Sequence, residues 1–444
     1  MTKLLDSCAL PPLLQTLQLV ADPITFLDRC ARRFGDTFTT RVLGWNSPPV
    51  VFFSAPEAIS EIFTTQADCL ALGQVTHPFR PLVGDLSLIM QEGKPHQRQR
   101  QLLMPPLHGD RMKFYGSTIC AITRTEIANW RPGMTLSIRP IVSAISLQVI
   151  LRMVFGLAPG QRYEHLKQHL DELLEAITSP LYSSQFFFPQ LQRNLGPWSP
   201  WGRFLYKREQ IDRLIAAEIG DRRQHSEMPR GDVLELLLTA QDESGEVMTD
   251  IELRDQLMTL LLLGHETTAS ALTWAFYWIH QQPQVEARLR QELAQADTPE
   301  AIAQLPWLNA ICKETLRIYP IALIAQPRVV RKPVQIEGRP YKPGEVLVPC
   351  IYTAHRRAAT YPNPEQFRPE RFLQKKMSPY EFFPFGGGAR SCIGAAFSLY
   401  EMKLVLATIL QTYRLAPAHT TLVRPMRRGI TFVPSDNFRL RVVG

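Results

Sequence analysis

The chain has 444 residues, of which 45% are apolar, so it is long enough for two or three domains or for one large helical enzyme with a small β region. Its net charge of +8 comes from Lys and Arg residues spread along the sequence, which disfavours nucleic-acid binding and suits an acidic protein partner, an anionic substrate or simply a basic surface. The seven cysteines are dispersed without a CxxC pair, which indicates a reducing compartment and argues against a disulfide framework or a zinc site.

The N-terminal segment contains no apolar run long enough to cross a bilayer, because Asp6, Pro11, Pro12 and Gln15 interrupt it. It also lacks the pattern of a signal peptide. We therefore expect a cytoplasmic protein without a transmembrane anchor. The leucines between residues 13 and 19 allow two interpretations, an ordinary first helix packed on the body of the protein or a helix in loose contact with a membrane surface.

The first regular elements are expected to be two strands, at residues 38–42 and 50–53, separated by a turn. A helix is predicted to start near residue 55, and residues 98–238 are mainly helical with proline-rich interruptions. The longest helix is predicted at residues 248–282. Its start carries a capping pattern, Thr249 to Glu252, and its apolar residues surround most of its circumference, which indicates a buried central helix.

The following segment alternates between short elements and irregular chain. A helix is predicted at residues 307–319, just before Pro320, and strands and turns at residues 329–349. Residues 358–388 form a long proline-rich stretch without periodicity. Such a stretch is uncommon in a compact domain unless it has a function.

Cys392 is the residue with the most distinctive surroundings. Three glycines, Gly386 to Gly388, precede it and allow close approach of the backbone to a flat group. A helical pattern begins at Ala395, and the N-terminus of a helix stabilises a thiolate. Arg390 adds a nearby cation. A buried cysteine in a glycine-rich turn is the alternative interpretation.

The segment from Phe385 to Gly394 resembles the haem-binding signature of the cytochrome P-450 superfamily, with Gly388, Arg390 and Cys392 at its other fixed positions. The resemblance implies that Cys392 is the proximal thiolate ligand of the iron of haem b. It also implies a mainly α fold with a smaller β region (α+β), in which the haem lies between a long central helix and the cysteine-bearing loop. We expect one domain over residues 1–444, with β-rich parts at about 34–75 and 325–355 and no fused reductase.

Glu314 and Arg317 lie three residues apart on the helix predicted at 307–319. By themselves they suit an ordinary solvated surface pair. The segment Pro369 to Phe372 resembles a second element of the family, and this resemblance implies that Arg371 joins Glu314 and Arg317 in a buried ionic triad that holds the cysteine loop in register.

Glu266 and Thr267 follow Leu263 and Gly264 within the apolar central helix, where an acid is costly to bury. One interpretation is an acid paired with a basic neighbour, with Thr267 bonded back to a carbonyl. The resemblance implies that this motif bulges the helix over the iron, and that the acid and the hydroxyl deliver protons to bound dioxygen. Leu263 departs from the family, which usually has Ala or Gly there, and this leaves the width of the pocket open.

The resemblance also assigns cofactor contacts to several other residues. His96 and Arg100 lie four residues apart in a segment that reaches a haem propionate, and Arg328 and Arg390 are the further cationic partners. Phe385 completes the set as the first residue of the signature. The alternative for each arginine is an ordinary surface residue.

The resemblance implies a haem-thiolate monooxygenase that uses O2 and electrons from a separate ferredoxin or flavodoxin with its reductase. A hydrophobic small molecule is the expected substrate, because the segments that line the pocket in relatives are apolar here (82–90, 186–188, 260–263, 321–325 and 429–431). Similarity to bacterial, particularly cyanobacterial, members favours hydroxylation of a long-chain fatty acid or alkane. Terpenoid or steroid hydroxylation is the closest alternative, followed by a haem-thiolate isomerase or dehydratase and by a non-enzymatic haem sensor.

Overall fold

The structure is a computed structural model that describes residues 10–65, 67–109, 111–157, 159–178, 184–186, 191–225, 231–419, 423–428, 431–435 and 438–444. The chain falls into two compact units, Met1–Val75 with Lys313–Cys392, and Thr76–Cys312 with Ile393–Gly444. The single domain expected from the sequence stays a prediction. The mainly helical composition with small sheets agrees with the predicted fold class.

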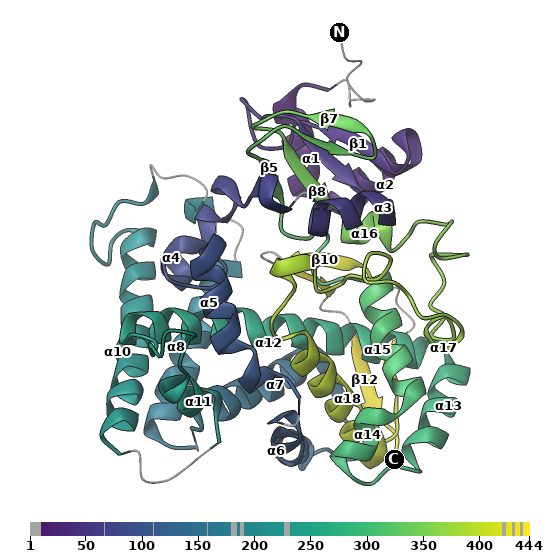
Figure 1. Cartoon of the computed structure of the whole chain (residues 1–444). Coiled ribbons are helices and arrows are strands. Elements are labelled where there is room, and N and C mark those ends of the chain that lie inside the picture. Colours follow the sequence, from purple (N-terminus) through teal and green to yellow (C-terminus); the bar gives the residue numbers. More distant parts are fainter. Residues whose placement is uncertain are drawn as a thin grey trace. The chain divides into compact units, whose positions relative to one another are not determined.

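The first unit combines a sheet with short helices (Figure 1). Its five strands follow the order β1-β2-β8-β5-β3, and β6 and β7 form a separate hairpin. Phe53, Ile59, Leu347 and Phe383 belong to its apolar core. Its elements are α1 (Pro12–Ala21), α2 (Pro23–Phe34), β1 (Thr37–Thr40), β2 (Val50–Phe53), α3 (Pro56–Ser60), the π-helix η1 (Glu61–Thr65), η2 (Ala67–Cys69), β3 (Leu70–Ala71), β5 (Arg328–Val330), β6 (Val334–Ile336), β7 (Arg339–Tyr341), β8 (Val346–Pro349), α16 (Ile351–Ala354), α17 (Arg371–Gln374) and η7 (Gly388–Arg390).

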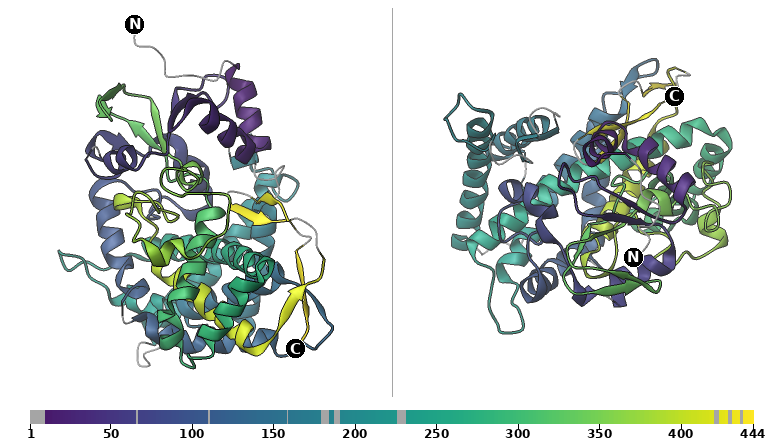
Figure 2. Two further views of the ribbon diagram at one scale, coloured as in Figure 1. Left: turned by 90° about the vertical axis from the view of Figure 1, so that its right-hand side faces the viewer. Right: turned by 90° about the horizontal axis from the view of Figure 1, so that it is seen from above.

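The second unit is a helical body with small sheets, and the sheet β4-β12-β9 lies beside the C-terminus (Figure 2). Two elements, η3 (Gly73–Phe79) and α15 (Pro306–Ile318), continue from one unit into the other. Its own elements are α4 (Arg80–Val83), α5 (Gly93–Leu103), η4 (Pro105–Leu107), α6 (Arg111–Ile127), β4 (Thr135–Ser137), α7 (Ile138–Phe155), α8 (Gln161–Thr178), η5 (Ser184–Phe186), α10 (Pro200–Gln224), α11 (Val233–Thr239), α12 (Asp250–Gln281), α13 (Pro283–Leu293), α14 (Pro299–Gln304), α18 (Ala395–Thr412), β9 (Leu415–Pro417), β10 (Pro425–Arg428), β11 (Thr431–Pro434) and β12 (Arg439–Val442).

Helix α12 is the buried central helix that the sequence predicts. Its N-terminus has the predicted capping box, because the Thr249 hydroxyl accepts from the Glu252 amide while the Glu252 carboxylate accepts from the Thr249 amide. It packs against α7, α10, α18 and β11. Only α7 among the described helices has the length and hydropathy of a membrane span, and 61% of that stretch is buried inside the protein.

Glu401 on α18 is a buried acid without a counter-ion among the described residues. Neither carboxyl oxygen has a hydrogen-bond partner among the described residues, and the Ser146 hydroxyl of α7 offsets only part of the effect of burial. Burial therefore raises the pKa of Glu401 to about 8. At neutral pH this side chain is a neutral carboxylic acid near Ser146 of α7.

We predict that Glu401→Gln stabilises the protein at neutral pH. The unfolded chain loses the Glu401 proton near pH 4.5, whereas the folded chain keeps it until about pH 8. Between these values, stability falls as pH rises by about 1.4 kcal/mol per unit for this group. Denaturant unfolding of both proteins from pH 5 to 8 should show a difference that grows with pH. An equal gain at every pH, or the same trend in the exposed control Glu209→Gln, would contradict the assignment.

Candidate functional site

Glu314 lies at the centre of a buried ionic cluster in the first unit. Its carboxylate accepts two hydrogen bonds from Arg317, at 2.7 and 2.8 Å, and a third from Nε of Arg371 at 3.3 Å. Glu314 and Arg317 are 0% exposed and Arg371 is 7% exposed. The triad expected from the sequence is therefore confirmed, and the solvated surface pair is excluded.

The two arginines also bind the backbone of the irregular segment. Arg317 donates to the His355 carbonyl at 2.8 Å, and Arg371 donates to the carbonyls of Pro362 and Asn363 at 2.6 and 2.8 Å. These carbonyls have no helix or strand to pair with, so the guanidinium groups satisfy them instead. The predicted lack of regular structure is confirmed over residues 358–388, where α17 is the one short α-helix.

His355 is a second support of this segment, and nothing in its sequence context singles it out. Its imidazole Nε2 accepts the backbone N–H of Phe383 at 3.1 Å, and its ring stacks on Phe382. Burial, followed by the nearby Arg317 and Arg356 charges, holds the pKa of His355 well below its usual range, so the ring stays neutral and can accept this bond. The chain is thereby fixed nine residues before Cys392.

The glycines before Cys392 also permit close packing on a neighbouring aromatic residue. A Cβ on Gly387 would lie 2.4 Å from the Phe63 ring, and one on Gly388 would lie 2.5 Å from the Phe63 carbonyl. Gly386 and Gly388 also have φ of +68° and +63°, which favour glycine. Two of the three glycines thus permit packing on Phe63 of η1, and the loop closes where the Cys392 amide donates to the Phe385 carbonyl at 2.8 Å.

The loop that carries Cys392 is accessible on its outer side. None of the residues 384–392 is buried, and Cys392 is exposed, unlike the described cysteines Cys30, Cys120, Cys312 and Cys350. Helix α18 begins three residues after the sulfur, as predicted. The buried-cysteine interpretation of Cys392 is therefore wrong.

The other predicted contacts in the first unit lie on the same loop and on the sheet. Phe385 and Arg390 are half-buried residues of the loop. Arg328 is 9% exposed at the start of β5, where its guanidinium donates to the Gln326 carbonyl at 2.6 Å.

In the second unit, the acid–threonine motif lies on an unbroken helix. Residues 250–281 are α-helical throughout, so the bulge expected from the resemblance is absent from this described segment. The Thr267 hydroxyl donates to the Leu263 carbonyl at 2.9 Å, and the Thr268 hydroxyl donates to the Gly264 carbonyl at 3.1 Å. These bonds run within the helix and leave its backbone pattern intact.

Glu266 is paired with two arginines that the sequence analysis did not identify. Its carboxylate forms an ion pair with Arg139 at the start of α7 and lies 3.4 Å from Nε of Arg428 on β10. A basic neighbour was one of the two interpretations of this acid, and this pairing is what the geometry shows. Arg139 could have been noticed as a cation at the start of an apolar helix, whereas nothing marks Arg428 among its neighbouring arginines.

One stripe of α12 is less covered than the rest of the helix. Leu260, Leu263, Gly264 and Thr267 are half-buried and follow the i, i+3, i+4, i+7 spacing of one helix face. Gly264 also meets α7, because a Cβ there would lie 2.8 Å from Cδ1 of Ile150. The helix therefore has an apolar surface that ends in a hydroxyl.

A strap formed by residues 84–90 runs along the same helix. The Asp255 carboxylate accepts the Leu86 amide at 2.9 Å, the Gln256 side chain binds both the Leu86 carbonyl and the Leu88 amide, and the Ser87 and Thr259 hydroxyls lie 2.7 Å apart. These contacts hold the strap on α12.

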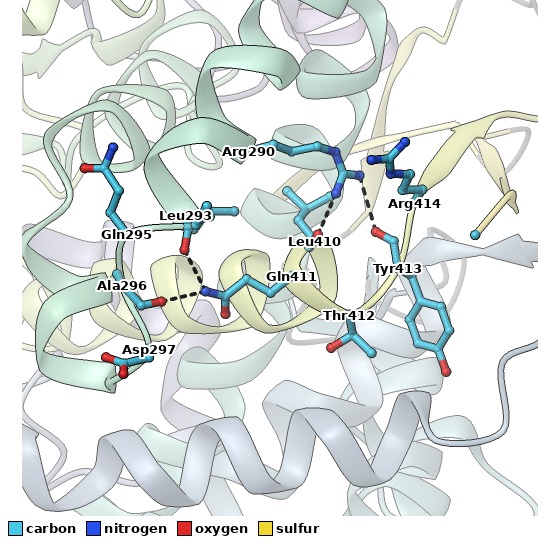
Figure 3. Close-up of a pocket in the computed structure, with 12 residues that line it drawn as sticks. Arg290, Leu293, Gln295, Ala296, Asp297, Leu410, Gln411, Thr412, Tyr413 and Arg414 are labelled. Carbon is cyan, nitrogen blue, oxygen red and sulfur yellow. Dashed lines mark hydrogen bonds between the residues drawn. The ribbon is translucent and has the colours of Figure 1, made fainter.

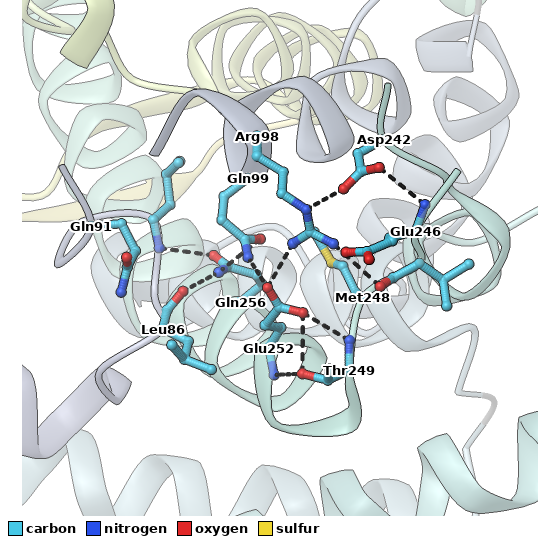
Figure 4. Close-up of polar contacts among 12 residues, drawn as sticks. Leu86, Gln91, Arg98, Gln99, Asp242, Glu246, Met248, Thr249, Glu252 and Gln256 are labelled. Carbon is cyan, nitrogen blue, oxygen red and sulfur yellow. Dashed lines mark hydrogen bonds and ion pairs between the residues drawn. The ribbon is translucent and has the colours of Figure 1, made fainter. Parts of the chain in front are cut away.

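Figure 4 shows how α5 is tied to the start of the same helix. Arg98 binds Glu252 at 2.7 Å and Asp242 at 2.5 Å, and Gln99 also donates to Glu252. This network fixes α5, on which His96 is buried and Arg100 half-buried, one turn apart.

A surface cavity of about 850 Å³ lies at the C-terminal ends of α13 and α18 (Figure 3). Arg290 donates there to the carbonyls of Leu410 and Tyr413, and Gln411 donates to those of Leu293 and Ala296. None of the predicted site residues lines it. Of the expected pocket segments, residues 187, 188, 429 and 430 lie outside the described residues.

Comparisons with known proteins agree with the signature and the triad. A family model for Cytochrome P450 matches residues 9–441. Cytochrome P450 135B1 of Mycobacterium tuberculosis is 35% identical over 444 residues, which cover 98% of this chain and 92% of that relative. Cytochrome P450 138 of the same organism is 34% identical over 441 residues, with 97% and 94% covered.

Solved structures show the same fold. The retinoic acid-bound cyanobacterial CYP120A1 matches with a TM-score of 0.82 at 24% identity, over 96% of both chains. The heme domain of cytochrome P450DA matches with a TM-score of 0.85 at 22% identity, over 99% of this chain and 96% of that one. The chain belongs to the cytochrome P450 family, whose members are monooxygenases that use haem b.

Proposed function

We propose that this protein is a haem-thiolate monooxygenase that hydroxylates a long aliphatic chain, either a fatty acid or an alkane. When bound, haem b supplies the oxygen-activating chemistry. The protein has to hold the haem, present the substrate, exclude water and bring protons. The observation that carries the substrate proposal is the half-buried apolar stripe of α12 with Thr267 at its end.

Cys392 is the proposed ligand of the haem iron. In support, it is exposed on a loop whose position is fixed by the Glu314 triad and by His355. Burial raises the pKa of the Cys312 and Cys350 thiols to about 12 and about 11, so these cysteines remain protonated and are poor ligands. An exposed thiol beside uncovered backbone fits the proximal face of a haem.

The haem propionates are assigned to His96, Arg100, Arg328 and Arg390, and Phe385 is assigned a contact with the macrocycle. His96 and Arg100 share one face of α5, which suits joint binding of one carboxylate. Arg328 and Arg390 belong to the unit that carries the thiol. Arginine binds carboxylates with two parallel donors, which suits this task.

Glu266 and Thr267 are the proposed proton-delivering pair. Thr267 lies on the half-buried stripe, where its hydroxyl is the polar group at the end of the apolar surface. Arg139 and Arg428 hold the Glu266 carboxylate in place. A positioned acid that can exchange a proton with a neighbouring hydroxyl provides general acid catalysis in a site from which water is largely excluded.

The apolar stripe and the strap favour an elongated hydrophobic substrate. Leu86, Ile89 and Met90 of the strap are half-buried, as are Leu260 and Leu263 on the helix. Leu263 makes this surface bulkier than the Ala or Gly usual in the family, which favours a slender chain. A terpenoid or steroid remains the second candidate, because an apolar surface accepts it as well, and the retinoic acid bound to CYP120A1 supplies a useful probe that is both isoprenoid and acidic.

Electrons are proposed to come from a separate ferredoxin or flavodoxin with its reductase, and the protein is proposed to be cytoplasmic. The positive net charge of +8 supports docking of an acidic electron carrier. The mostly buried position of α7 supports a core role for this apolar helix.

The substrate class is tested by titrating the purified ferric holoprotein with palmitic acid, hexadecane, a neutral sesquiterpene and retinoic acid. A bound substrate that displaces the water ligand of the iron changes the haem absorption spectrum. We expect saturable changes with the linear compounds. A response confined to the sesquiterpene and retinoic acid would transfer the assignment to terpenoids.

Loss of the triad should give protein without haem. Glu314→Ala leaves two buried guanidinium groups without their counter-ion, at a cost of about 3–5 kcal/mol. We expect the cysteine loop to lose its register and the purified variant to lack haem absorption. Glu209→Ala, which breaks the exposed pair with Arg213, is the control and should retain haem. A folded Glu314→Ala protein with a full complement of haem would contradict this role.

In Thr267→Ala and Glu266→Gln, we expect NADPH to be oxidised without a matching yield of product. Both variants keep Cys392 and the triad, so we expect normal haem content. Product formed per NADPH oxidised should fall, by up to about a hundredfold, because proton delivery is impaired. Thr273→Val on the same helix is the matched control, since its hydroxyl bonds the Ala269 carbonyl in the buried core. Unchanged product yield in both variants would remove these residues from the mechanism.

A further inference from the structure

Helix α1 presents its apolar side outward. Leu13, Leu14, Leu17 and Val20 are 40–55% exposed and share one helix face, whereas Gln15 is 2% exposed. The ten residues Pro12–Ala21 include no charge. A helix packed on a globular protein normally buries its apolar stripe and exposes its polar residues. Here the arrangement is reversed.

Polar contacts fasten this helix in its reversed orientation. The Gln15 side chain donates to the Leu10 carbonyl at 2.7 Å and accepts the Arg41 amide at 2.9 Å. The Thr16 hydroxyl accepts the Gly44 amide at 3.1 Å. The exposed leucines therefore result from specific bonds that hold the opposite face of α1 on the loop between β1 and β2.

The same loop carries two further exposed apolar side chains. Leu43 is 51% and Trp45 is 77% exposed. Gln15 and Thr16 hold this loop on α1, so the exposed apolar side chains of the loop and of the helix belong to neighbouring elements. We call the set the N-terminal apolar face (Leu10, Leu13, Leu14, Leu17, Val20, Leu43 and Trp45). Tryptophan is enriched where one end of a side chain meets hydrocarbon and the other meets water.

Cations lie on the elements next to this face. Helix α2 packs on α1 (Figure 1). It displays exposed Arg29, Arg32 and Arg33, and Arg41 is exposed on the loop. None of these four arginines forms an ion pair with a residue that the structure describes.

The acids of α2 and of the turn after it are already engaged. Asp22 caps Thr25, Asp28 accepts from Tyr352 and Asp36 pairs with Arg357. Uncharged apolar surface flanked by unpaired arginines is complementary to a layer of anionic head groups over hydrocarbon.

We propose that the N-terminal apolar face docks on the surface of an anionic bilayer, with α1 lying in the plane of the interface. The proposal stands independently of the reaction and of its substrate. It gives the protein a peripheral membrane position through a helix that lies in the interface. Each arginine near the surface should contribute about a fivefold gain in binding to anionic vesicles, which is lost at high salt.

The test is flotation of the full-length holoprotein with vesicles of phosphatidylcholine and phosphatidylglycerol, compared with phosphatidylcholine alone. We expect wild-type protein to float with the anionic vesicles, and Leu14→Asp/Leu17→Asp to lose at least about tenfold in binding, because two charged groups would enter hydrocarbon. Arg29→Gln/Arg33→Gln should reduce binding to anionic vesicles only. Circular dichroism and the haem spectrum confirm that each variant is folded.

Leu195→Asp is the control, because Leu195 is an even more exposed leucine (67%) in the second unit. It should float as wild type does. Absence of flotation by wild-type protein, or equal loss in Leu195→Asp, would overturn the proposal. A concentration-dependent dimer in light scattering that Leu17→Asp abolishes, without vesicle binding, would instead assign this face to a second copy of the chain.

Discussion

The irregular segment before the cysteine depends on one buried carboxylate. Glu314 is fully removed from water, so it requires compensating charge and hydrogen bonds, and Arg317 and Arg371 supply both. The donors that remain on these guanidinium groups are directed to carbonyls of His355, Pro362 and Asn363, which lie outside helices and strands. A segment without helices or sheets thus acquires a defined path, and a thiol acquires a defined position. Nε2 of His355 accepts the hydrogen bond of the Phe383 amide and so fixes the chain at Phe383 as well.

The sequence predicted the elements that have strong local rules. The limits of α12 were found to within two residues because a capping box opens it and Pro283 follows it. The triad was predicted through the family resemblance, since spacing alone could not show that Glu314 and Arg317 are buried. The contacts of His355, Arg139 and Arg428 were missed because their partners lie far away in the chain. Gly387 and Gly388 were assigned to a flat ligand, whereas their packing against Phe63 required knowledge of the π-helix η1. The bulge in α12 was expected from the resemblance and is absent from residues 250–281, where the threonine hydroxyls bond within the helix.

Three acids of this chain show how the groups around a carboxylate determine its charge state and its structural role. Glu314 has two guanidinium partners and organises a loop. Glu266 has Arg139 and Arg428 and stays ordered beside a threonine on an otherwise apolar surface. Glu401 has no ionic partner among the described residues and remains protonated near neutral pH. The same principle applies in reverse to α1, where polar Gln15 is buried because the backbone offers it partners, while the leucines are left facing outward.

The central claim is that the ionic triad fixes the loop that carries Cys392, and hydrogen exchange in Arg371→Lys tests it most directly. Lysine keeps the charge beside Glu314 but cannot reach both the Pro362 and the Asn363 carbonyls as the arginine fork does. We expect faster amide exchange at Phe383, Gly386 and Cys392, whose N–H groups are hydrogen-bonded in the structure, with α12 unchanged. Equal protection of these amides in the variant and the wild-type protein would show that the loop is held by other contacts.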